Sequence, residues 1–241
     1  MRDFLLYCRY MNIGFFDSGK GAYFIAEYFR KKFPYYNISV FTDTKNVPYG
    51  NKSDTELLLL LEKNVRELFN DNAKLVIVAC NTLSTTHLKN IQDNLVKNEF
   101  PDRKVLGVAI PTIEAIIESS YKNFLVLATE NTVRSEYFER KIKILDPEKK
   151  IITHAIPNLA TVIENGDFQQ AQEIISQVID SIEDSYEVIV LACTHYTILK
   201  DFLREKYPNT IIFSQDEIVA DKLEEYLCLH SDIKMAVRKE N

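Results

Sequence analysis

The chain has 241 residues, of which 46% are hydrophobic and 27% are charged. This composition is typical of a globular protein with a sizeable core, and it excludes a disordered tail, a collagen-like fibre and a coiled coil. The 29 basic and 35 acidic residues give a net charge of −6, which argues against a nucleic-acid partner.

The cysteines and the amino-terminal segment indicate a cytoplasmic protein. The four cysteines, Cys8, Cys80, Cys193 and Cys228, are widely spaced and form no CxxC pair, which favours reduced thiols over a disulfide framework. Residues 1–10 hold only a short apolar run without a signal-peptide cleavage site. No stretch approaches the ~20 apolar residues of a membrane span, so we expect no membrane association.

Along the chain, short apolar runs alternate with longer periodic segments, a pattern that predicts βα units and a parallel sheet. Runs such as Val76–Val78 and Val188–Val190 are apolar at every position, as expected of strands with helices on both faces. Eight strands are predicted, at residues 11–16, 38–42, 75–79, 105–108, 124–128, 151–155, 188–192 and 210–213.

Helices are predicted between these strands. Ser53 and Glu56 have the spacing of a capping box before an apolar segment that extends to Phe69, and Pro111 is suited to the first turn of a later helix. The remaining predicted helices cover residues 167–183, 197–206 and 216–228. No Pro-, Gly- or Ser-rich linker interrupts the pattern.

An internal repeat divides the chain into two related halves. In each half a buried strand is followed by Ala-Cys and then by a polar residue and a Thr-containing helix start, with the cysteines Cys80 and Cys193 about half the chain apart. We therefore expect an α/β protein of two pseudo-twofold-related domains with mainly parallel sheets and an active site in the cleft between them. The first domain would comprise residues 1–106 plus 214–241, and the second residues 107–213.

Each repeated cysteine is placed where ligands bind in open α/β sheets, at the carboxyl end of a strand. A thiol there also precedes a helix, whose positive end is expected to lower the thiol pKa from about 8.5. One such cysteine is more often an inert buried residue, but two in matched contexts favour reactive thiols. Cys8 and Cys228 have no such context.

Two thiols in mirrored positions are best explained by racemisation. A redox pair would normally lie closer in sequence, and Cys80, Cys193 and His195 have no zinc-like spacing, so no metal is expected. Inverting a stereocentre requires one group to remove a proton from one face and another to return a proton to the opposite face. Asp17 and His195 are positioned to assist the thiols or to bind an ammonium group. Donors for a substrate carboxylate are predicted at Asn81, Thr82, Thr129, Thr132 and Thr194.

Five segments then carry a family resemblance. They are Ile13–Gly19, Thr42–Thr44 with Val47–Ser53, Ala79–Thr82, Ala128–Val133 and Ala192–Tyr196. In this order, over residues 11–226, the chain resembles the cofactor-independent aspartate/glutamate racemases and, through Val47–Ser53, the glutamate racemases among them.

The resemblance implies a role for each site residue. Cys80 and Cys193 would be the two proton carriers, with Asp17 assisting Cys80 and His195 assisting Cys193. Glu164, in the second domain, would be a further acidic residue on the Cys193 side. The positions that match substrate-binding residues of the family are Ser18, Tyr49, Gly50, Asn81, Thr82, Thr129, Thr132 and Thr194.

The resemblance also implies a function. A protein of this kind interconverts L-glutamate and D-glutamate without a metal or pyridoxal phosphate. It supplies D-glutamate for peptidoglycan in the bacterial cytoplasm, often as a homodimer.

The chain departs from the family pattern in a few places. After Asp-Ser-Gly the family has a small apolar residue and Gly-Gly, whereas this chain has Lys20, Gly21 and Ala22. Ile156-Pro157 replaces a Cys-Pro of the family, and residues 228–241 resemble nothing we can place.

Three alternative functions remain. The first is an aspartate racemase, against which Val47–Ser53 argues. The second is a decarboxylase-like relative, whose site would need a single thiol. The third is a non-catalytic binding or regulatory protein on a racemase fold.

Overall fold

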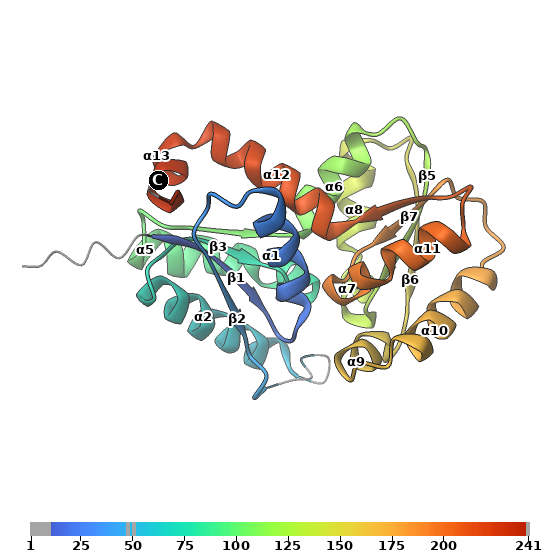
Figure 1. Cartoon of the computed structure of the whole chain (residues 1–241), viewed down its shortest axis with the longest axis horizontal. Coiled ribbons are helices and arrows are strands. Elements are labelled where there is room, and N and C mark those ends of the chain that lie inside the picture. Colours follow the sequence, from blue (N-terminus) through green and yellow to red (C-terminus); the bar gives the residue numbers. More distant parts are fainter. Residues whose placement is uncertain (1–10, 47–48, 50–51, 240–241) are drawn as a thin grey trace, which may run out of the picture.

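The computed structural model describes residues 11–46, 49 and 52–239. Figure 1 shows two lobes, each with strands at its centre and helices around them. Eight strands form two sheets of four: β1 (Asn12–Asp17), β2 (Ile38–Thr42), β3 (Ala73–Val78) and β4 (Lys104–Gly107), then β5 (Asn123–Ala128), β6 (Lys150–Ala155), β7 (Val188–Leu191) and β8 (Ile211–Ser214). All eight predicted strands are confirmed, with their ends shifted by no more than two residues.

Helices cover both faces of each sheet. Those of the first lobe are α1 (Gly21–Lys32), α2 (Asp54–Asn70), α3 (Asn81–Thr86), α4 (Leu88–Asn90), the π-helix η2 (Ile91–Val96), α5 (Lys97–Glu99), α12 (Gln215–Leu229) and α13 (Ser231–Val237). Those of the second lobe are α6 (Ala109–Glu118), α7 (Glu130–Arg134), α8 (Tyr137–Leu145), α9 (Leu159–Glu164), α10 (Phe168–Asp180), the 3₁₀-helix η3 (Thr194–Leu199) and α11 (Lys200–Lys206).

The two sheets have the same topology. Their strand orders are β2-β1-β3-β4 and β6-β5-β7-β8, and every pairing within them is parallel. The predicted fold class is therefore confirmed, and β3 and β7, which precede the two repeated cysteines, occupy equivalent places. In each sheet the chain leaves neighbouring central strands, β1 and β3 or β5 and β7, in opposite directions. Such a switch point opens a crevice at the carboxyl ends of the strands.

The core lies on both faces of each sheet because successive strand side chains alternate between faces. Phe15 packs in the cluster with α1 and α12, whereas the next residue, Phe16, packs in the cluster with α2. Both are fully buried, and each such side chain contributes roughly 1.5–3 kcal/mol to folding. This packing on both faces holds the carboxyl end of β1, where Asp17 lies, in a fixed position.

The chain passes from one lobe to the other after β4 and again after β8. Helix α6 packs in the core of the second lobe and α12 in the core of the first, as Figure 1 shows. The domain boundaries at residues 106/107 and 213/214 stay a prediction.

Most of the helix starts and helix ranges predicted from the sequence agree with the structure. The capping box of α2 is present, since Ser53 accepts a hydrogen bond from the Glu56 backbone and the Glu56 carboxylate accepts one from the Ser53 backbone. The helix predicted at 197–206 is confirmed for residues 200–206 (α11), but residues 197–199 belong to the 3₁₀-helix η3, in whose tighter turn Thr197 Oγ1 donates to the Thr194 carbonyl at 2.7 Å. The segment after Cys228, unplaced from sequence, forms α13 on the first lobe.

Candidate active site

A cleft of about 660 Å³ lies between the lobes, and it is lined by the carboxyl ends of strands from both sheets. It contains Cys80 and Cys193 and most of the other predicted site residues: Asp17, Ser18, Tyr49, Asn81 and Thr82 from the first lobe, and Thr129, Glu164, Thr194 and His195 from the second. Thr132 lies behind this lining, buried, with its hydroxyl 3.1 Å from that of Thr129. Gly50 lies outside the described residues.

Cys80 is held at the junction of β3 and α3. It is buried, and the Ser18 hydroxyl lies 3.9 Å from its sulfur. Burial raises the pKa of the Cys80 thiol well above its ordinary value, and the nearby Asp17 carboxylate raises it further. The expectation that the following helix lowers this pKa is therefore wrong. Desolvation and a neighbouring carboxylate outweigh the dipole of α3, which has only six residues.

Cys193 has a cationic partner instead. It follows β7, and its sulfur lies 4.0 Å from Nδ1 of His195, whose Nε2 lies 2.6 Å from Oε1 of Glu164. Burial lowers the pKa of His195, but the contacts with Cys193 and Glu164 and the charge of Asp17 outweigh it and raise that pKa to about 10. His195 is therefore an imidazolium at neutral pH.

Glu164 is held as a carboxylate. Burial raises its pKa, but hydrogen bonds from His195 and from the Lys20 backbone, with the charges of both residues, lower it overall. Its position at the end of α9 is fixed by Gly166, whose φ of +82° ends the helix in a conformation that favours glycine.

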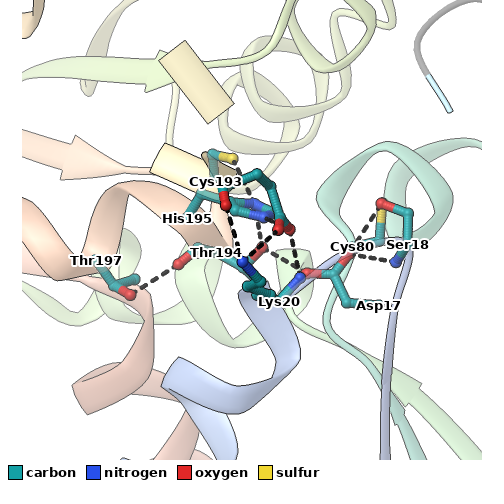
Figure 2. Close-up of polar contacts among 9 residues, drawn as sticks. Asp17, Ser18, Lys20, Cys80, Cys193, Thr194, His195 and Thr197 are labelled. Carbon is teal, nitrogen blue, oxygen red and sulfur yellow. Dashed lines mark hydrogen bonds and ion pairs between the residues drawn. The ribbon is translucent and has the colours of Figure 1, made fainter. Parts of the chain in front are cut away.

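Asp17 joins the two sides of the cleft (Figure 2). Its Oδ2 accepts a hydrogen bond of 2.7 Å from the Thr194 hydroxyl, and its Oδ1 accepts one of 2.7 Å from the Ser18 backbone. It is almost completely buried, which raises its pKa. Hydrogen-bonding contacts therefore run from Cys80 through Ser18, Asp17, Thr194 and His195 to Cys193.

Other predicted residues make contacts that the sequence did not reveal. The Thr82 and Thr129 hydroxyls, from opposite lobes, lie 3.4 Å apart. The Tyr49 hydroxyl donates to Asp43 at 2.8 Å, and burial raises the pKa of Tyr49. Asp43 also accepts hydrogen bonds from Asn46, which secures the loop after β2 beside the site.

Sequence reasoning missed Gln215, the first residue of α12. Its side-chain amide pairs with that of Asn81 through hydrogen bonds of 2.6 and 3.0 Å, and it also donates to Thr112 at 2.9 Å. Gln215 is fully buried and fixes the residue next to Cys80. Its signal was its place directly after strand β8, because the carboxyl ends of strands carry the site residues in this fold.

Arg134 was also missed. Among the described residues that line the cleft, it is the only lysine or arginine. It lies at the end of α7, two residues after Thr132, in the segment that the sequence singled out for its threonines.

Among the described residues, no three His, Cys, Asp or Glu side chains are grouped so as to hold a metal ion. Nor does this part of the chain contain a helix that is long and apolar enough to span a bilayer.

The fold is similar to that of known proteins. The family model of the Asp/Glu/Hydantoin racemases matches residues 33–221. The glutamate racemase of Ruegeria pomeroyi is 30% identical over 239 residues, covering 93% of this chain and 88% of its own. The structure of a glutamate racemase isoform from Bacillus anthracis is similar with a TM-score of 0.81 and 28% identity, over 92% of this chain and 83% of its own.

A third match shares the fold. The glutamate racemase of Francisella tularensis, solved in complex with D-glutamate, has a TM-score of 0.81 at 21% identity, over 96% of this chain and 84% of its own. The chain belongs to the Asp/Glu/Hydantoin racemase family. Within this family its relatives are the glutamate racemases, which are isomerases.

Proposed function

We propose that the protein interconverts L-glutamate and D-glutamate by a cofactor-independent proton transfer between two thiols. The observation that carries the proposal is the pair of cysteines, Cys80 from the first lobe and Cys193 from the second, in one cleft. A substrate α-carbon between them would lose its proton to one sulfur and receive a proton on the opposite face from the other.

The charges in the cleft make the two thiols unlike. The Cys80 thiol is buried beside a carboxylate, which favours its protonated form, whereas the Cys193 sulfur lies 4.0 Å from the imidazolium of His195. For one enantiomer, one of the two sulfurs acts as the base and the other as the acid. After one turnover these roles are reversed, as the other enantiomer requires.

The remaining groups would bind the substrate. The hydroxyls of Ser18, Thr82 and Thr129 and the cation of Arg134 suit its carboxylates, while Asp17 suits its ammonium group. The α-proton of an amino acid is a very weak acid, so donors held in place must stabilise the charge that develops at the α-carboxylate. Each well-placed donor contributes roughly 3 kcal/mol to lowering the barrier.

The biological setting is part of the proposal. D-glutamate would serve peptidoglycan synthesis in a bacterial cytoplasm, and the protein would act as a homodimer. The family resemblance supports both statements.

The experiment is a racemisation assay with purified protein, L-glutamate or L-aspartate, and no added cofactor, read by chiral chromatography. We expect D-glutamate to form much faster than D-aspartate. Faster turnover of aspartate would show an aspartate racemase, and no turnover of either would favour a binding protein on this fold.

A further inference from the structure

Lys20, directly before α1, binds Glu164 across the cleft. Its backbone N–H donates to Oε1 of Glu164, and its side-chain Nζ donates to the Glu164 backbone carbonyl at 2.9 Å. Nζ also lies 3.8 Å from the carboxylate Oε2. One residue of the first lobe therefore holds both the backbone and the side chain of a residue in the second.

Glu164 is tightly confined at this contact. Its Oε1, which accepts from the Lys20 backbone, also lies 2.6 Å from Nε2 of His195. A Cβ at the adjacent Gly19 would overlap the Glu164 carboxylate and lie 3.3 Å from that same nitrogen. The carboxylate thus has one position in which it meets both Lys20 and His195.

We propose that Lys20 is a positioning residue for the Cys193 side of the reaction. It acts through Glu164, which it holds against His195 when the lobes meet, and His195 in turn contacts the Cys193 sulfur at 4.0 Å. This inference rests on the proposed racemase function. Lys20 does not line the cleft, so its effect falls on proton transfer rather than on substrate binding.

The exposure of the Lys20 side chain limits how much its ion pair with Glu164 can contribute. The Lys20 side chain is 60% exposed, and exposed ion pairs contribute little by themselves. The chain offers a matched comparison in Lys63, 65% exposed, which also lies 3.8 Å from a glutamate, Glu67, but within helix α2. A general loss of surface charge would affect both lysines alike, whereas positioning of Glu164 involves only Lys20.

The kinetic test compares the variants Lys20→Met, Lys20→Arg and Lys63→Met. We expect Lys20→Met to lower kcat about three- to tenfold with KM nearly unchanged, and Lys20→Arg to retain most of the activity. Lys63→Met should match the wild type. An equal kcat in Lys20→Met and Lys63→Met would overturn the proposal.

A second readout follows the pH dependence. The charged groups that act on Glu164 are His195, from η3, and Lys20, and both lower its pKa. Without the Lys20 charge this pKa rises, so the acidic limb of the rate profile should move to higher pH in Lys20→Met. In a Glu164→Gln background, Lys20→Met should have little further effect on kcat. An undiminished loss there would show that Lys20 acts elsewhere.

A third readout does not depend on turnover. Titration of the His195 imidazole by NMR, assigned with His195→Gln, should show a pKa lower in Lys20→Met than in the wild type, because Glu164 is less firmly held. An unchanged His195 titration would overturn the proposal. If the wild type racemises no substrate, the proposed function fails, and this titration still decides whether Lys20 positions Glu164.

Discussion

At the scale of single residues, the two sulfur atoms differ in the charge placed beside them. Cys80 lies near the buried carboxylate of Asp17, and Cys193 lies 4.0 Å from the imidazolium of His195. The proposed inversion of the α-carbon needs both sulfurs, because each would act on only one face of the substrate. Without one sulfur, the other has no group on the opposite face to complete the proton transfer.

We therefore predict that Cys80→Ala and Cys193→Ala each reduce racemisation by at least about a hundredfold, the lower range for loss of a positioned acid or base. Cys228→Ala is the matched control, because this exposed thiol on α12 lies outside the cleft and should not affect turnover. Turnover would be measured by circular dichroism of the substrate solution. Near-normal activity in either of the first two variants would end the two-thiol mechanism.

His195 makes stability depend on pH. Folding raises its pKa from 6.5 to about 10, so the folded state binds a proton that the unfolded state releases within this window. The stabilisation is complete below about pH 6.5 and is lost as the pH rises towards 10, with a limiting slope of roughly 1.4 kcal/mol per pH unit. Denaturant unfolding should show that the wild type exceeds His195→Gln in free energy of unfolding, and that this excess shrinks as the pH rises over this range. If the excess in unfolding free energy grew with pH, it would contradict the raised pKa of His195.

At the scale of elements, the turn between β1 and α1 places several contacts of the site. A Cβ at Gly21 would overlap the side chains of Asp17 and Thr194, and one at Gly19 would overlap Glu164. The two glycines therefore allow the first lobe to approach the second closely. The family's third glycine is Ala22 here, and it is accommodated because it packs in the core behind α1.

We predict that Gly19→Ala lowers kcat at least about tenfold by displacing Glu164 from His195. Gly14→Ala, on the same strand–turn–helix unit, is the control: its Cβ would lie 3.0 Å from Leu68 Cδ2 in the core, far from the cleft. That variant should lose about 1 kcal/mol of unfolding free energy and keep its kcat. Reduced activity in Gly14→Ala equal to that in Gly19→Ala would indicate a general effect on the fold.

The strands could be expected from the sequence because each is a short apolar run between polar turns. Val76–Val78 and Val188–Val190 gave the strands before both cysteines, and the repeat gave their equivalent places. Short helices were missed. Helix α9, which carries Glu164, has only six residues, too few to show a clear apolar periodicity.

Contacts between distant segments could not be predicted from local patterns. Gln215 pairs with Asn81, and Thr194 donates to Asp17, only because the two sheets face each other. The pKa of Cys80 was predicted in the wrong direction for the same reason. Its burial and the nearby carboxylate arise from packing, while the sequence showed only the helix that follows.

At the scale of the whole molecule, the candidate site is complete only where the two lobes meet. Hydrogen bonds between Thr194 and Asp17 and between Lys20 and Glu164 cross the cleft, and the hydroxyls of Thr82 and Thr129 approach each other at 3.4 Å. Each lobe provides one thiol. In the proposed mechanism, the duplicated half-sheet provides two similar acid–base groups that act on one substrate from opposite sides.

The most direct test of this account is the fate of the α-hydrogen when wild-type protein converts L-glutamate in deuterated water. At early conversion, the enantiomers would be separated and the α-position examined by proton NMR. Two thiols predict that the D-glutamate formed carries deuterium, because its new hydrogen comes from a second sulfur that has exchanged with solvent, while the remaining L-glutamate still carries its proton. D-glutamate that retains the original α-proton would show that one group carries it from face to face, and would contradict the two-thiol mechanism.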